Sequence, residues 1–249
     1  FCSTYAAQWV SAVVRYVQLT GDRPILEDLY PAALGNIAAL ECGVTDKGLA
    51  LSNAWPFVDW GYAPDADGMD AASTLHLLEA ARALSVWCAM LGHQSDGEKA
   101  DALAARLGAW SRAYLERCMR DGAWARAGYH VAVLALRNVL VDDAEVANCI
   151  AHIKAHMLDC FPNNPDAPRL SAPSVTSRRL ITPYFAHFAM PELIRRGEMD
   201  FVLDQYRHCW GWALEGGRTT WLEVFDPRWS HCHEWSGSPT WQLSRYALG

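Results

Sequence analysis

The chain has 249 residues, 51% of them hydrophobic, which is enough to bury a sizeable core in one large domain or two small ones. Its formal net charge is −7 and its 21 lysine and arginine residues form no dense basic run, so the composition argues against a nucleic-acid partner. No apolar run reaches the roughly 18 residues that a membrane-spanning helix requires, so no membrane partner is expected.

Apolar residues recur at helical spacing along most of the chain, and glycine, proline and aspartate separate the runs. A helix over residues 4–20 is expected to end at Gly21, and Pro24 suits the first turn of a second helix that ends near Cys42. Further helices are expected at about residues 69–91, 98–120, 129–140, 143–159, 183–196, 199–214 and 239–248. These nine or so helices, without any period-2 strand pattern, predict an all-α fold.

Short and long connections alternate between these helices. The short turns would close helical hairpins, whereas the long loops after Cys42, Pro162 and Gly217 carry tryptophan, histidine and carboxylate residues. Because loops on one rim of a rigid scaffold commonly form sites, a toroid of helical hairpins with its site on that rim is the simplest expectation. A solenoid of helical repeats is the alternative, but the sequence shows no fixed-period repeat.

Twelve tryptophans and eight cysteines stand out in the composition. Some tryptophans would fill the core, but indole faces also stack on the C–H faces of sugar rings, which favours a carbohydrate site. The cysteines include no Cys-x-x-Cys pair, so they are expected to be buried free thiols in a reducing, cytoplasmic compartment. The sequence starts at Phe1 and shows no signal peptide, as expected of a piece of a longer protein.

Two stretches near the C-terminus place polar groups among indoles: TTWLE at residues 219–223 and HEWSGSP at residues 233–239. Such a mixture is typical of a small polar site with apolar walls. On the residues alone, Glu223 could instead be a surface glutamate, and His233, Trp221 and Trp235 could belong to the core.

A third stretch, FVDWG at residues 57–61, lies in the first long loop. Asp59 follows apolar neighbours and precedes Trp60. Its carboxylate could accept hydrogen bonds from backbone N–H groups in the loop, or it could bind sugar hydroxyls. Trp60 could be a core residue or the wall of a sugar site.

These stretches, together with YAAQWVSAVVRYVQLTGDRPILEDLYP at residues 5–31, the segment 181–223 and SHCHEWSGSPTWQLSRYALG at residues 230–249, occur in the order typical of one family. The chain resembles the inverting α-L-rhamnosidases that have a six-hairpin (α/α)6 catalytic domain. The Cys-His-x-Trp-Ser motif followed by proline and a helix ending in Leu-Gly is the most specific part of this resemblance. It implies a glycoside hydrolase acting on terminal α-L-rhamnosyl or related deoxy-sugar linkages, without a cofactor or metal.

The resemblance also implies roles for individual residues. Glu223 matches the glutamate that acts as general base, and His233 matches the histidine at the rhamnose pocket. Asp59, Trp60, Trp221 and Trp235 are expected to bind the sugar or line its pocket. The chain departs from the family at Leu222, where tryptophan is usual, and at Glu234, where a small residue is common.

One family feature is missing from the sequence. The family's general acid lies in an acidic Asp-Glu-Arg-Leu-Gly-Trp-type motif, which does not occur among these 249 residues. The acid and the flanking β-rich domains are therefore expected elsewhere in a longer parent chain. A catalytically inactive carbohydrate-binding relative of the same fold is the alternative function.

The helix expected over residues 143–159 carries or adjoins four residues of the kinds that bind zinc. His152 and His156 are one turn apart, and Cys149 and Cys160 bracket them. One helix alone rarely supplies a closed tetrahedral site, and the His-Glu-x-x-His pattern is absent, so the sequence does not favour zinc.

Overall fold

The computed structural model describes residues 2–46, 48–49, 56–63, 70–170 and 178–248. They belong to two units, which are described separately here. The first unit comprises Phe1–Val58, Pro64–Ala127 and Asn138–Leu140, and the second comprises Asp59–Ala63, Gly128–Arg137 and Val141–Gly249.

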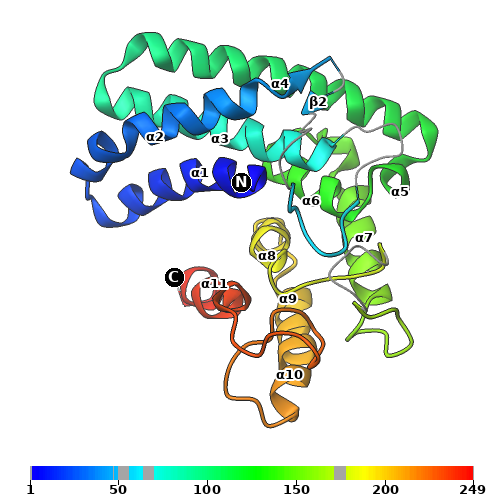
Figure 1. The fold of residues 1–249 in the computed structure, drawn as a ribbon. Coiled ribbons are helices and arrows are strands. Elements are labelled where there is room, and N and C mark those ends of the chain that lie inside the picture. Colours follow the sequence, from blue (N-terminus) through cyan, green and yellow to red (C-terminus); the bar gives the residue numbers. More distant parts are fainter. Residues whose placement is uncertain (1, 47, 50–55, 64–69, 171–177, 249) are drawn as a thin grey trace. The chain divides into compact units, whose positions relative to one another are not determined.

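In the first unit, three long helices, α1, α2 and α4, pack against a fourth, α3 (Figure 1). The helices of this unit are α1 (Ser3–Thr20), α2 (Pro24–Glu41), α3 (Ala71–Leu91), α4 (Gln94–Asp121) and the short α5 (Ala123–Ala127). A two-residue antiparallel ladder joins β1 (Val44–Thr45) to β2 (Gly48–Leu49), with Val44 opposite Leu49.

Helix α3 forms the core of this unit because almost every residue of its first half is apolar or small and buried. Asp70 caps its N-terminus by accepting a hydrogen bond from the Ser73 N–H at 2.9 Å. Gly92 ends it in the left-handed conformation. Near that end, the fully buried Trp87 donates its indole N–H to the Leu26 carbonyl at 3.0 Å, which joins α3 to α2.

The second unit contains shorter helices that pack on α8 (Ala186–Ile194) (Figure 1). Helices α6, α9 and α11 all contact α8. The other elements of the unit are α6 (Tyr129–Arg137), α7 (Asp143–Asp159), α9 (Met199–Gln205), a π-helical turn η1 (Tyr206–Trp210), α10 (Gly211–Glu215), a 3-10 turn η2 (Glu234–Ser236) and α11 (Ser238–Tyr246).

The predicted all-α class is confirmed, and each expected helix is present with its ends shifted by a few residues. The helix expected over residues 199–214 is interrupted by η1, and α5 and the β1–β2 ladder are elements that the sequence pattern did not predict. These elements have two to five residues each, which is too short to produce a periodic pattern.

Two predictions from composition can be compared with the structure. All eight cysteines are free thiols, but Cys42 and Cys232 are exposed rather than buried. Within the described residues, no helix is both long and apolar enough to cross a membrane.

Candidate functional site

The segment 221–236 folds back on itself, and backbone hydrogen bonds fix its two halves together. The Glu223 N–H donates to the Ser230 carbonyl at 2.9 Å, and the His233 N–H donates to the Trp221 carbonyl at 3.0 Å. The Ser236 hydroxyl donates to the Leu222 carbonyl within the same loop. The two stretches singled out in the sequence, around Glu223 and around His233, therefore form one structural unit, which we call the Glu223 loop (residues 221–236).

Trp235 lies at the centre of this loop. Its indole N–H donates to the Glu223 carbonyl at 3.0 Å, and its ring lies 4.1 Å from the His233 ring, centroid to centroid. The same ring lies 4.8 Å from that of Tyr184. Trp235 thus fixes the backbone of Glu223 and places an aromatic surface beside His233.

The Glu223 side chain ends in a carboxylate that has no partner among the residues that the structure describes. It is half-buried, and within the described part of the chain its carboxylate makes no hydrogen bond and no ion pair. The backbone of this residue is held from both sides, whereas the carboxylate remains available to water or a ligand. This arrangement suits a group that must accept a proton.

Residues of helices α8 and α11 and of the π turn hold the Glu223 loop in place through hydrogen bonds. Trp241 donates its indole N–H to His187 Nδ1 at 3.1 Å, and His187 Nε2 donates to the Trp235 carbonyl at 2.6 Å. Burial lowers the pKa of His187, although its bond to Trp235 opposes this shift, so the neutral imidazole with its proton on Nε2 fits both contacts. Trp210 of η1 donates to the Ser236 carbonyl at 2.8 Å.

Asp59 is buried, and both of its carboxylate oxygens have partners. Oδ1 accepts from the Trp60 N–H at 2.8 Å and from the Thr182 hydroxyl at 2.6 Å. Oδ2 accepts from His130 Nε2 at 2.8 Å, and none of the Asp59 side chain is exposed. Of the two roles that the sequence left open, this geometry favours an anchor that fixes Trp60 and Thr182.

The glycine of the FVDWG stretch allows this turn to approach its neighbours closely. A Cβ atom at Gly61 would lie 3.0 Å from the Cβ and 3.1 Å from the carbonyl oxygen of Leu180. Only glycine avoids both contacts without a shift of the backbone. The turn that carries Asp59 and Trp60 is therefore packed directly on the segment that leads to Thr182.

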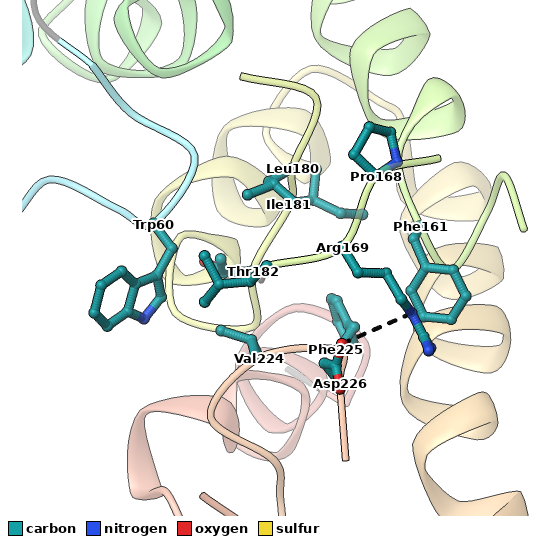
Figure 2. A pocket seen from close by; sticks show the side chains of 11 residues that line it. Trp60, Phe161, Pro168, Arg169, Leu180, Ile181, Thr182, Val224, Phe225 and Asp226 are labelled. Carbon is teal, nitrogen blue, oxygen red and sulfur yellow. Dashed lines mark ion pairs between the residues drawn. The ribbon is translucent and has the colours of Figure 1, made fainter. Parts of the chain in front are cut away.

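A pocket lies where this turn meets the residues that follow Glu223 (Figure 2). The centre of a water molecule can occupy only about 20 Å³ of it, although all the space between its atoms, open solvent included, amounts to about 300 Å³. Trp60 packs with Val224 in an apolar cluster that also contains Leu170, Leu180 and Trp229. The lining residues are Trp60, Phe161, Pro168, Arg169, Leu170, Leu180, Ile181, Thr182, Val224, Phe225 and Asp226.

Asp226 is the buried charge of this pocket. Arg228 forms two side-chain hydrogen bonds to its carboxylate, at 2.9 Å and 2.6 Å, and the Arg228 N–H adds a third. Burial alone would raise the pKa of Asp226, but the hydrogen bonds and the charge of Arg228 outweigh burial and lower it. The carboxylate is therefore ionised at neutral pH and is held by Arg228.

The sequence-predicted site residues thus fall into two groups. Trp221, Glu223, His233 and Trp235 lie together on the Glu223 loop, and Trp60 lines the pocket formed in part by Val224, Phe225 and Asp226. Sequence reasoning missed His130, Thr182, His187, Arg169 and Asp226. Of these, Thr182 and His187 lie in the segment 181–223 that carries part of the resemblance, but no local pattern marks their roles.

Of the four residues of the candidate zinc site, His156, Cys160 and Cys149 make other contacts, whereas His152 Nε2 is buried without a hydrogen-bond partner among the described residues. His156 Nε2 donates to the Leu180 carbonyl at 3.2 Å and lies 3.6 Å from the Cys160 sulfur, while Cys149 contacts the Ala132 carbonyl. The Tyr129 ring stacks on His156 at 4.4 Å. Among the residues that the structure describes, no group of three or more histidine, cysteine or acidic side chains could hold a metal ion.

Comparison with known proteins identifies the family. A scan against protein families matches residues 2–246 to the bacterial α-L-rhamnosidase six-hairpin glycosidase domain. The chain belongs to this family. A search of curated proteins found no match.

Two solved structures share the fold of this rhamnosidase-family domain. One is a GH78 family rhamnosidase of Bacillus sp. GL1, with 20% identity, a TM-score of 0.71 and 98% of the present chain covered. The other is a rhamnosidase from Klebsiella oxytoca with rhamnose bound, with 19% identity, a TM-score of 0.72 and 100% covered. The chain spans 26% and 48% of their respective lengths, so it corresponds to part of larger rhamnosidase chains.

The buried histidines of this rhamnosidase-family domain predict a loss of stability in acid. Burial lowers the pKa of His156 from 6.5 to about 4, and the hydrogen bond to Leu180 only partly opposes this. The folded state then binds fewer protons than the unfolded state, so stability is full above about pH 6.5 and falls as the pH drops towards 4. Burial also lowers the pKa values of His152 and His187, and they contribute with the same sign.

Urea unfolding at pH 7, 6 and 5 would measure this effect. The wild-type midpoint should fall with pH, and His156→Gln should show a shallower fall because that imidazole no longer has to be protonated. His208→Gln, at an exposed position, is the matched control and should follow the wild type. Equal pH slopes for all three proteins would contradict the assignment to His156.

Proposed function

We propose that this domain cleaves terminal α-L-rhamnosyl or related deoxy-sugar linkages with inversion, and that Glu223 is the general base. An inverting glycosidase needs a carboxylate that activates water on the sugar face opposite the leaving group, which a carboxylic acid protonates. The observation that carries the proposal is that the Glu223 carboxylate has no partner among the described residues, while hydrogen bonds hold the backbone of its loop. A residue whose carboxylate was engaged in a structural ion pair would be a poorer base.

The neighbouring residues receive supporting roles in this proposal. His233 would bind sugar hydroxyls, and Trp221, Trp235 and Trp60 would contact the apolar face of the ring. Asp59 would act through Trp60 and Thr182, since its carboxylate is buried and fully hydrogen-bonded. The general acid and the flanking β domains would come from other parts of a longer parent chain.

The substrate proposal rests on family membership together with this composition of the site. The Klebsiella oxytoca relative was solved with rhamnose bound. An inactive carbohydrate-binding member of the family would share the sugar pocket and lack turnover, so binding and cleavage must be measured separately.

Titration of the 249-residue chain with L-rhamnose tests the binding half of the proposal. Tryptophan fluorescence should change saturably, because in this proposal Trp60, Trp221 and Trp235 contact the sugar. D-mannose, which has a hydroxyl at C6 and the opposite ring handedness, is the control and should bind more weakly. If neither sugar produces a saturable change, or D-mannose binds as well as L-rhamnose, the rhamnose pocket is placed wrongly.

A further inference from the structure

A chain of hydrogen bonds runs from α11 through α8 to the backbone of Glu223. Trp241 on α11 donates its indole N–H to His187 Nδ1 at 3.1 Å, and His187 Nε2 donates to the Trp235 carbonyl at 2.6 Å. Trp235 in turn donates its indole N–H to the Glu223 carbonyl at 3.0 Å. We call Trp241, His187 and Trp235 the His187 relay. Its end is the backbone of the residue that is proposed as the general base.

The partners of His187 accept only one protonation state of its ring. The indole N–H of Trp241 can only donate a hydrogen bond, and the carbonyl of Trp235 can only accept one. The imidazole must therefore accept at Nδ1 and donate at Nε2, which requires the neutral tautomer with its proton on Nε2. Both contacts are lost to any other form of the ring or are reduced to one.

Protonation of His187 would break the first bond of the relay. A proton added at Nδ1 would face the Trp241 N–H, so two donors would oppose each other where a 3.1 Å hydrogen bond now lies. Burial also disfavours the charged ring and lowers the pKa of His187, although the bond to Trp235 opposes this shift. The relay is thus complete while the imidazole is neutral and is interrupted once it is charged.

The charged groups of the surrounding elements do not determine this behaviour. Helices α6, α9 and α11 pack on α8 (Figure 1). Their charged or titratable residues are Tyr129, His130 and Arg137 on α6, Asp200 and Asp204 on α9, and Arg245 and Tyr246 on α11. In the Glu223 loop, His233 and Glu234 precede Trp235. The pKa of His187 is set by burial and by the bond to Trp235, and among the described residues none of these groups adds to them.

We propose that His187 is a positioning residue for Glu223, because its neutral imidazole holds Trp235 and, through Trp235, the backbone of the base. The proposal rests on the role of Glu223 as general base given above. A displacement of about 1 Å at a reacting group can cost on the order of 10²-fold in rate, so a relay that acts only on the backbone is sufficient to affect turnover. Protonation of His187 should then add a second step to the acid limb of activity, beside the protonation of Glu223.

NMR of the 249-residue chain tests the relay without any turnover. Long-range proton–nitrogen spectra should show the Nε2–H tautomer of His187 at pH 7. Trp241→Phe removes the donor to Nδ1 and should raise the pKa of His187, because a proton there no longer meets an N–H. His187→Phe should accelerate hydrogen exchange of the Trp235 indole N–H, since the Trp235 backbone is then less firmly held.

His152→Gln is the matched control for these measurements. His152 is a half-buried histidine of the same unit whose pKa is also lowered by burial, but it lies on α7 and has no contact with the relay. Its replacement should leave both the Trp235 exchange rate and the His187 titration unchanged. Any general effect of removing a half-buried imidazole would appear in this variant as well.

Turnover of an aryl α-L-rhamnoside by the full-length protein tests the consequence for catalysis, in the pH range where all variants remain folded. His187→Phe should lower kcat roughly 10- to 100-fold at neutral pH. His187→Gln keeps one acceptor and one donor on an amide that does not titrate, so it should restore most of the turnover and lose the second step of the acid limb. His152→Gln should retain the kcat and the pH profile of the wild type.

Several results would overturn the proposal. They are an unchanged Trp235 exchange rate or a wild-type kcat in folded His187→Phe, and an unchanged His187 pKa in Trp241→Phe. If His187→Phe does not fold, Trp241→Phe and His187→Gln still decide, since Trp241 is 39% exposed and glutamine keeps the polar contacts. Near-normal turnover by Glu223→Gln would instead refute the general base and leave the NMR result standing, whereas an inactive Glu223→Gln beside a fully active His187→Phe would refute the positioning role alone.

Discussion

Replacing Glu223 with glutamine is expected to lower turnover of an aryl α-L-rhamnoside by roughly 10²- to 10⁴-fold in the full-length protein, which is the usual contribution of a general base. Glutamine keeps the size of the side chain but cannot accept the proton of the attacking water. The backbone contacts of this residue to Ser230 and Trp235 do not involve the carboxylate, so they should persist in the variant. Folding and L-rhamnose affinity should therefore change little.

Glu234→Gln is the matched control for this experiment. Glu234 lies on the same loop, but it is exposed and no resemblance assigns it a role. The same charge is removed there, so any general electrostatic effect of the substitution would appear in both variants. Near-normal turnover by Glu223→Gln, or an equal loss in Glu234→Gln, would exclude Glu223 as the base.

The helices could be predicted from the sequence because their burial follows a period that the residues themselves display. α1 is the clearest case, since its buried residues Ala7, Val10, Val13, Val14 and Val17 recur at helical spacing and Gly21 follows its last turn. The π turn at Tyr206–Trp210 could not be predicted in this way, because its residues continue the helical pattern. It is distinguished by its tertiary contacts, since Trp210 donates a hydrogen bond to Ser236 and Tyr206 donates one to Gln242.

The candidate site divides in the same manner. The residues of the Glu223 loop are close in sequence, so their common location followed from the two motifs. The environment of Asp59 did not, because His130 and Thr182 are 71 and 123 residues away along the chain. From the sequence, the Asp59 carboxylate could anchor a loop or bind a sugar. Which of the two roles it has depends on contacts with residues distant in the sequence, which no local pattern reveals.

The contacts of Asp59 give the second large prediction, on stability. Asp59→Ala should lower the free energy of unfolding by about 3 kcal/mol, because it removes a buried carboxylate that accepts three hydrogen bonds and leaves its donors without an acceptor. For a chain of this size, the thermal midpoint should fall by roughly 6 to 12 °C. Thermal denaturation followed by circular dichroism would measure the change.

Asp204→Ala provides the control, because Asp204 is 73% exposed and, among the described residues, pairs with Arg207 alone, across one helical turn. Its removal should change stability by no more than about 0.5 kcal/mol. The two roles of Asp59 can then be separated by measuring L-rhamnose affinity at a temperature where the Asp59→Ala variant remains folded. If Asp59 is an anchor, its replacement should lower the stability of the fold. The affinity for L-rhamnose should then fall only because Trp60 is displaced. A variant with normal stability and no rhamnose binding would instead identify Asp59 as a direct sugar ligand.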